Sequence, residues 1–156
     1  MQKWIILTII LLIGVIGGFI VMNVSFETEY VPESEFEESE LRKTIVSLYF
    51  KDKNSNQIIK ETKMIDSKEL LKNPYNLLIN QLIEGPESDN YEKIIPMETK
   101  IIDTKIENGC VLINLSKEFI NSDEEKIKMS IETIDKTLRE LTEVSGIKIL
   151  VEGEEI

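Results

Sequence analysis

The stretch TKIIDTKIENGCVLINLS, residues 99–116, decides the fold. Two runs rich in β-branched residues flank Asn108-Gly109, a dipeptide that favours the positive φ angles of a type I′ hairpin turn. A two-residue loop fixes the register, so that Ile102 is expected opposite Leu115 and Asp103 opposite Asn114. One face then carries only apolar or β-branched residues, namely Ile102, Thr104, Ile106, Val111, Ile113 and Leu115. Because the other face is mostly polar, the sequence predicts an antiparallel sheet covered on one side.

Two strands are predicted before this hairpin. Residues 44–50, TIVSLYF, are rich in β-branched and aromatic residues and predict a strand. Residues 51–56 are polar and predict a turn. Residues 57–65 alternate only in part and carry several charges, which favours a second strand at the edge of a sheet.

Helical signals follow the second strand. Asp66-Ser67 is expected to cap a short helical turn over residues 68–71. Asn73 as N-cap and Pro74 at the first helical position predict a longer helix, which Gly85-Pro86 ends. Its apolar face has three- and four-residue spacing, in Tyr75, Leu78, Ile79, Leu82 and Ile83. Residues 87–98 are expected to form a loop.

A second amphipathic helix is predicted after the hairpin. Ser122 and Glu125 form a capping box, and the helix is expected to run to about Val144. Its predicted buried stripe is Ile127, Ile131, Ile134, Leu138 and Leu141. Two i,i+4 ion pairs are expected outside the stripe, Glu132–Lys136 and Asp135–Arg139.

The predicted elements combine into one domain over residues 42–156. Ser145-Gly146 ends the second helix, and residues 147–151 predict a final strand. The resulting order is β-β-α-β-β-α-β. This order indicates an α+β two-layer sandwich, with two amphipathic helices covering a mostly antiparallel sheet of four to five strands.

A membrane anchor is predicted at the start of the chain. Residues 4–24 carry no charge, and 21 helical residues rise roughly 31 Å, enough to cross a hydrocarbon core of about 30 Å. Lys3 precedes this run, which predicts a cytoplasmic N-terminus, a transmembrane signal anchor within residues 1–24 and an extracytoplasmic remainder. The alternative is a cleaved signal peptide, although no A-x-A cleavage pattern follows the run.

The charge of the chain is uneven. Residues 25–40 contain seven Glu and no base, and we interpret residues 25–41 as an acidic stalk. The whole chain has a formal net charge of −11. Nucleic acid is excluded as a partner, because phosphate binding needs clustered Lys and Arg.

The residue inventory excludes several kinds of site. The chain has no His, which excludes Ser/His and Cys/His nucleophilic pairs and His-based zinc sites. Cys110 is the sole cysteine and is expected to be a small apolar strand residue. The acidic run Asp123–Glu125 is explained by helix capping. The sequence therefore predicts no catalytic, cofactor-binding or metal-binding residue.

The order and spacing of the motifs resemble the GerMN domain, a sporulation and spore-germination module. The resemblance covers about residues 42–154. It is carried by Leu48-Tyr49-Phe50, by residues 77–86 (LLINQLIEGP), by residues 95–99 (IPMET) and by residues 108–119 (NGCVLINLSKEF). The resemblance implies a non-enzymatic, extracytoplasmic domain that is similar to the ring-building modules of secretion machines. The best-known relative has two tandem copies and a lipid anchor, whereas this chain has a single copy behind an apolar run.

Three functions follow as hypotheses. The first is an assembly or scaffold protein that is tethered to the membrane and binds envelope or secretion-complex proteins, or itself. The second is a sensor that binds cell wall or a small ligand, for which Tyr91 in the 87–98 loop is the aromatic candidate. The third is a cell-wall hydrolase, which requires two carboxylates at a suitable separation in a cleft.

Overall fold

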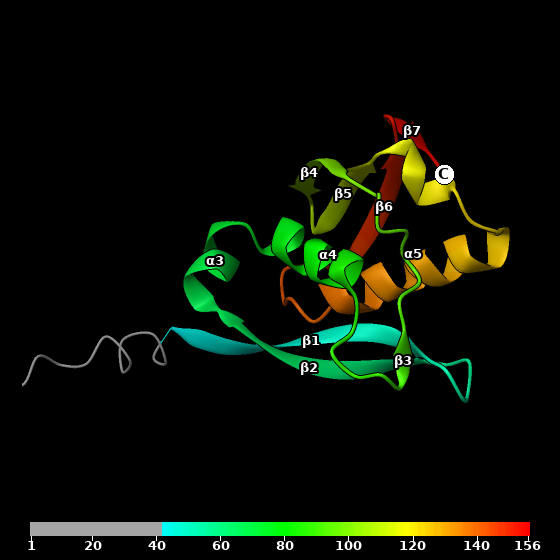
Figure 1. The fold of residues 1–156 in the computed structure, drawn as a ribbon. Helices are drawn as coiled ribbons and strands as arrows, with labels where there is room; N and C mark the ends of the chain where they lie inside the picture. The colour runs from blue at the N-terminus through cyan, green and yellow to red at the C-terminus, as the bar shows by residue number, and fades with distance from the viewer. Residues whose placement is uncertain (1–41) are drawn as a thin grey trace, which may run out of the picture. The chain divides into compact units, whose positions relative to one another are not determined.

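Within residues 42–156, which a computed structural model describes, the strands form two sheets (Figure 1). The first sheet has the order β2-β1-β3, from Ile58–Asp66, Lys43–Asp52 and Tyr91–Glu92. The second has the order β4-β5-β6-β7, from Ile101–Glu107, Cys110–Leu115, Gly146–Val151 and Glu154–Glu155. The predicted anchor (1–24) and stalk (25–41) lie outside the described residues.

Helices α4 (Pro74–Glu84) and α5 (Glu124–Leu138) lie between the two sheets (Figure 1). Helix α4 contacts β1 and β4, and helix α5 contacts β1 and β6. A short helix α3 (Ser67–Lys72) follows β2, and a 3-10 helix spans Lys117–Ile120. The α+β class is therefore confirmed, whereas the strands divide between two sheets instead of forming one.

The central hairpin follows the predicted register over most of its length. Asn108 and Gly109 have φ angles of 51° and 80°, and Asp103 pairs with Asn114 as expected. The expected pair Ile102–Leu115 is wrong, because Ile101 occupies the position opposite Leu115. A bulge inserts one extra residue at this point, as is common on an edge strand, and it leaves Ile102 50% exposed.

Helix α4 begins and ends as the sequence predicts, and α3 extends one residue beyond each end of the predicted turn at 68–71. The Asp66 side chain accepts a hydrogen bond from the Lys68 N–H and caps α3. The Asn73 side chain caps α4, Pro74 is its first residue, and Gly85 ends it with a φ of 103°. The buried face of α4 consists of Leu78, Ile79, Leu82 and Ile83.

Helix α5 differs from the prediction at both ends. Asp123, not Ser122, is the N-cap, and its side chain accepts from the Lys126 N–H at 2.9 Å. The helix ends at Leu138 and not near Val144, because the chain tightens into turns: the Leu141 N–H donates to Leu138 O at 3.0 Å. The expected ion pairs Glu132–Lys136 and Asp135–Arg139 are confirmed, at 2.9 and 2.8 Å.

The buried face of α5 is also rotated from the predicted stripe. It consists of Ser130, Thr133, Ile134, Thr137 and Leu138. Ile127, Ile131 and Leu141 pack against the core but stay partly exposed. Small residues face inward because α5 lies beside β1 and β6 at once, which limits the room for larger side chains.

Two short strands were not predicted. Strand β3 pairs Tyr91 with Asp52 in the segment that was expected to be a loop, and β7 pairs Glu154 with Val151. Two residues are too few to show a hydrophobic period. The final predicted strand is confirmed as β6, and it pairs in parallel with β5.

Candidate binding surfaces

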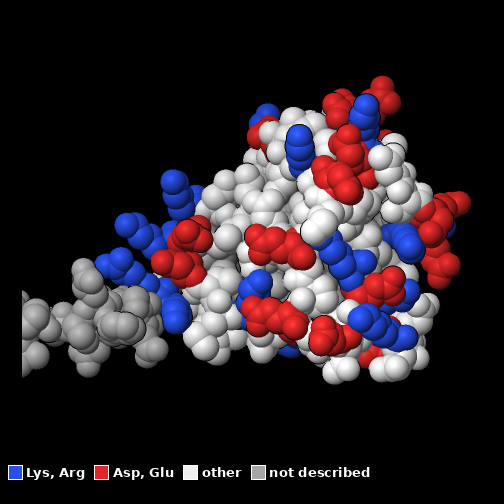
Figure 2. All heavy atoms as spheres, viewed as in Figure 1, with Lys and Arg blue, Asp and Glu red and all other residues white. Residues whose placement is uncertain are grey.

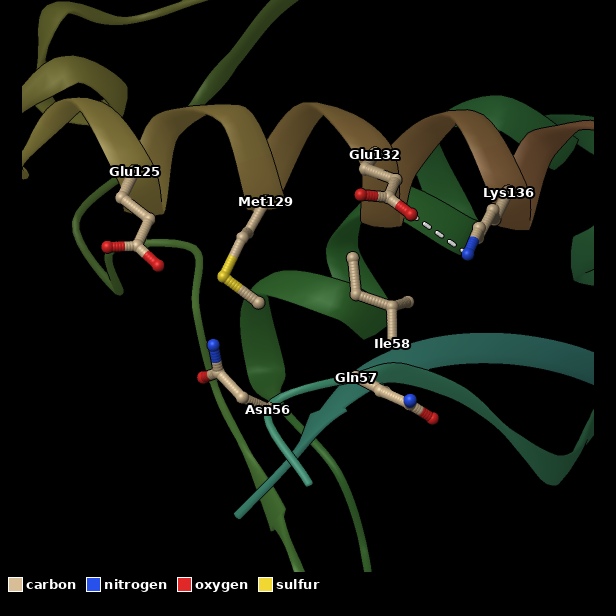
Figure 3. A pocket seen from close by; sticks show the side chains of 7 residues that line it. All are labelled: Asn56, Gln57, Ile58, Glu125, Met129, Glu132 and Lys136. Atoms are coloured by element: carbon tan, nitrogen blue, oxygen red, sulfur yellow. Dashed lines mark ion pairs between the residues drawn. The ribbon is translucent and has the colours of Figure 1, made fainter. Parts of the chain in front are cut away.

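A polar cleft lies between the β1–β2 turn and α5 (Figure 3). Its volume is about 450 Å³, and it is lined by Asn56, Gln57, Ile58, Glu125, Met129, Glu132 and Lys136. Glu125, Met129, Glu132 and Lys136 recur every three or four residues on α5, so they share one face of the helix. The cleft offers two carboxylates, an ammonium group and two side-chain amides to a polar ligand.

The two carboxylates of the cleft come from one face of α5. Glu125 and Glu132 are seven residues apart, which separates their backbone positions by about 10 Å along the helix. Lys136 also lies 2.9 Å from a Glu132 oxygen, so this carboxylate is already paired (Figure 3).

A second feature is an open stretch of the edge of β1. The Tyr49 N–H donates to Thr137 Oγ1 of α5 at 3.1 Å, so it points away from β2. Backbone groups alternate sides along a strand, and those of Ile45 and Ser47 therefore point to the same side as the Tyr49 N–H. Strand β3 pairs only with Lys51 and Asp52 on this side. On this side of β1, none of the described residues is paired with the backbone of Ile45 or Ser47.

This open edge is the floor of a small apolar groove, which we call the β1 edge groove. It has a volume of about 170 Å³, and its lining is Ile45, Val46, Ser47, Leu70, Leu78, Thr137, Glu140 and Leu141. Leu70 comes from α3 and Leu141 from the turns after α5, so the walls belong to elements that are far apart in the sequence. The side chain of Ile45 is 69% exposed.

Glu140 closes the groove at its Tyr49 end. The Tyr49 hydroxyl donates to Glu140 Oε1 at 2.6 Å. This hydrogen bond, together with burial, raises the pKa of Tyr49 above its ordinary value. The contact holds the end of α5 against β1 and leaves only the Ile45–Ser47 part of the edge open.

The residues that the sequence singled out lie apart from both surfaces, with one exception. Tyr91 lies in β3, is half-buried and packs against the core. Cys110 is a partly exposed strand residue, opposite Glu107. Asp123 caps α5, whereas Glu125 lines the polar cleft. Within residues 42–156 no group of three or more potential metal ligands comes together.

No local sequence pattern predicts the groove residues, because the groove forms by contacts between elements that are distant in the sequence. Alternation in residues 44–50 predicts a strand, but it does not tell which edge of that strand stays unpaired. The exposed side chain of Ile45 lies among β-branched residues that are typical of any strand.

None of the helices in residues 42–156 combines the length and the apolar character of a membrane span.

The family model described as Germane, sporulation and spore germination, matches residues 47–156. This match covers well over half of the chain. The chain belongs to the Germane family. The matched range includes both sheets, apart from the first residues of β1, and all the described helices. The resemblance to GerMN domains in the sequence is therefore confirmed.

Two solved structures from Bacillus subtilis share the fold. The tandem GerMN domains of the sporulation protein GerM align with a TM-score of 0.64 and 18% identity, over 73% of this chain and 41% of that one. The first GerMN domain of the same protein aligns with a TM-score of 0.63 and 19% identity, over 72% of this chain and 86% of that one. The chain therefore spans about two fifths of the tandem structure. No protein of curated function matches the chain.

Proposed function

We propose that this Germane domain is a non-enzymatic assembly module of the cell envelope, tethered to the membrane and facing away from the cytoplasm. Its role is to bind an envelope or secretion-complex protein during sporulation or germination. The observation that carries this proposal is the β1 edge groove, an unpaired strand edge between apolar walls.

An unpaired edge suits a protein partner because strand addition forms main-chain hydrogen bonds along the new pair. The apolar walls then select the side chains that point into the groove. The groove volume of about 170 Å³ holds one or two side chains, and it is below the roughly 300–1,000 Å³ of a small-molecule site. Partner proteins therefore fit this surface better than metabolites do.

Tethering is supported by the uncharged run at residues 4–24 and by the basic residue before it. The test is membrane fractionation of the tagged full chain, followed by protease treatment of intact cells or protoplasts. The anchored protein is expected in the membrane fraction, with residues 42–156 open to the external protease. A protein in the soluble fraction would contradict the anchor.

The assembly role is tested by in-cell crosslinking in growing and in sporulating cells, with crosslinked partners identified by mass spectrometry. Ser47→Pro removes the central donor of the open edge, and its N–H points away from β2, so the β1–β2 pairing is kept. Thr62→Pro is the matched control, because Thr62 is the cross-strand partner of Ser47 and its N–H points to the opposite edge. The proposal expects a specific partner that Ser47→Pro loses and Thr62→Pro keeps. Equal crosslinking in all three proteins would place the contact elsewhere.

A second candidate function is the binding of a wall fragment in the polar cleft. The amides of Asn56 and Gln57 and the carboxylate of Glu125 suit a ligand with hydroxyl and amino groups. Titration with soluble wall fragments, followed by NMR, tests it. Shifts confined to residues of the cleft and lost in Gln57→Ala would favour this function, and unchanged spectra would remove it.

A further inference from the structure

Basic side chains gather at the end of the domain that carries α3 and the start of β1 (Figure 2). We call this surface the α3 patch, which consists of Arg42, Lys43, Met64, Lys68, Leu71 and Lys72. Its parts are neighbours in the fold: Lys43 pairs with Asp66, and the Ser67 N–H donates to Arg42 O. The patch thus joins the first residues of β1 to the helix that follows β2.

The lysines of the patch face solvent without local neutralisation. No carboxylate of residues 42–156 lies within ion-pair distance of Lys43, Lys68 or Lys72, although Lys128, Lys136 and Lys148 elsewhere are each paired at 2.9 Å. Glu37, Glu38 and Glu40 precede Arg42 in the sequence, and two acids of residues 42–156 are also nearby. Asp66 is engaged with the Lys68 N–H at 2.7 Å, and Glu69 lies on α3 itself. Within residues 42–156, the three lysines of the patch therefore outnumber these two acids.

The same patch exposes large apolar side chains. Leu71 is 84% exposed and Met64 is 64% exposed, which places both among the most exposed apolar residues of the domain. Met64 is also the cross-strand partner of the exposed Ile45. A surface that combines lysines with exposed Leu and Met is typical of segments that lie in the headgroup region of a bilayer, where long basic side chains reach the lipid phosphates.

We propose that the α3 patch docks on an anionic lipid bilayer. Lys43, Lys68 and Lys72 contact lipid phosphates, while Leu71 and Met64 enter the boundary of the acyl chains. The inference rests on the tethering in the proposed function. The uncharged run ends at residue 24, so residues 25–41 extend at most about 60 Å and keep the patch within reach of the membrane.

The rest of the chain is acidic, so the patch is the part of the chain that is expected to bind anionic lipid. Residues 42–156 have 22 acids and 17 bases, and residues 25–40 add seven Glu, so the chain as a whole is repelled by anionic lipid. Only a local excess of lysines produces attraction, and it does so for one orientation of the domain. Docking would therefore leave the polar cleft, at the opposite end of the β1–β2 hairpin, free.

The test uses the full chain, reconstituted in vesicles of brominated phosphatidylcholine with or without brominated phosphatidylglycerol. Trp4→Phe removes the sole natural tryptophan, and Leu71→Trp places a reporter in the patch. Met97→Trp is the control reporter, because Met97 is 71% exposed and lies outside the patch. We expect bromine quenching of the Leu71→Trp reporter to rise at least twofold with phosphatidylglycerol, and quenching of the Met97→Trp reporter to stay unchanged.

Charge variants identify the residues responsible. Lys68→Gln/Lys72→Gln is expected to remove the lipid-dependent quenching of the Leu71→Trp reporter, and high salt is expected to weaken it. Lys100→Gln/Lys117→Gln makes the same change of charge at exposed lysines elsewhere and is expected to have no effect. Circular dichroism checks that each variant is folded.

Flotation of the vesicles separates this inference from the tethering. A chain that floats with both lipid mixtures, with equal quenching of the two reporters, would overturn docking and leave the tethering intact. A chain that floats with neither mixture would overturn both. Crosslinking of the patch to a second copy, without lipid-dependent quenching, would assign the patch to a protein contact and overturn the proposal as well.

Discussion

The two long hairpins of this domain leave apolar side chains exposed to different extents. In the β4–β5 hairpin, the β5 residues Val111, Ile113 and Leu115 are all 0% exposed. In the β1–β2 hairpin, Leu48 is equally buried, but Ile45 and its partner Met64 are 69% and 64% exposed. Both hairpins bury one strand face, but Ile45 and Met64 are more exposed than Ile102 and Ile106 of β4, which are 50% and 40% exposed.

The turns of the two hairpins also differ, because different groups hold them closed. Asn108 and Gly109 close the β4–β5 hairpin through backbone conformation, with both φ angles positive. The β1–β2 turn is instead held by the Asp52 carboxylate, which accepts from the N–H groups of Asn54 and Ser55 at 2.8 and 2.6 Å. Backbone conformation thus closes one turn, and a side-chain carboxylate holds the other.

The largest expected effect is the loss of a β5 core side chain. Ile113→Ala removes buried methyl groups and leaves a cavity, so the free energy of unfolding is expected to fall by about 2–5 kcal/mol. Ile45→Ala makes the same change at an exposed position and is expected to alter it by less than about 0.5 kcal/mol. Urea denaturation followed by circular dichroism measures both. Equal losses would show that Ile45 is buried in solution and would break the comparison.

A smaller effect is expected from the turn glycine of the β4–β5 hairpin. Gly109→Ala forces a side chain into a φ of 80°, and its Cβ would lie 2.8 Å from Ser145 Oγ, so a loss of about 2–3 kcal/mol is expected. Gly153→Ala is the control, because Gly153 has a φ of 90° but no atom within 4 Å of the added Cβ. Denaturation midpoints should therefore fall further for Gly109→Ala. If the two midpoints fell equally, the contact with Ser145 would have no role.

The next largest effect is expected from the hydrogen bond between the Tyr49 N–H of β1 and Thr137 of α5. Thr137 is 0% exposed and accepts from the Tyr49 N–H, so Thr137→Val leaves that donor unpaired and is expected to cost about 1–2 kcal/mol. Thr133, one turn earlier, is also buried, but its hydroxyl has no partner among the described residues. Thr133→Val should therefore be neutral or slightly stabilising. Equal destabilisation by both variants would mean that α5 does not hold β1 through this hydrogen bond.

Local signals explain which parts of the fold are predictable from the sequence. Asn108-Gly109, Asn73-Pro74 and Gly85-Pro86 each set a backbone conformation within a few residues, and the structure has a turn or a helix end at each of them. The end of α5 is different, since apolar residues continue to Val144 in a helical spacing. Packing determines where the helix ends, because Val144 is buried by a tighter turn instead of by a continuation of the helix.

The candidate surfaces depend on contacts between distant elements, and no local pattern contains them. The β1 edge groove exists because α5 covers Tyr49 while β3 reaches only Lys51 and Asp52. The polar cleft joins Asn56 to Glu125, residues far apart in the sequence. The extra residue at Ile102 is equally non-local, because Lys100 is held opposite Ser116 by a hydrogen bond of 2.9 Å.

The smallest effect concerns the turn of the β1–β2 hairpin and depends on pH. Hydrogen bonds from Ser55, and then from Asn54, lower the pKa of Asp52 below its ordinary value of 3.8. A lowered pKa in the folded state means that the ionised carboxylate stabilises the fold above pH 3.8, and that this stabilisation is lost as the pH falls through the folded-state pKa. The stability difference between the natural protein and Asp52→Ala should therefore be constant near neutral pH and shrink in acid. Because both proteins share every other carboxylate, a difference that does not change with pH would show that the turn is held by backbone geometry, as in the β4–β5 hairpin.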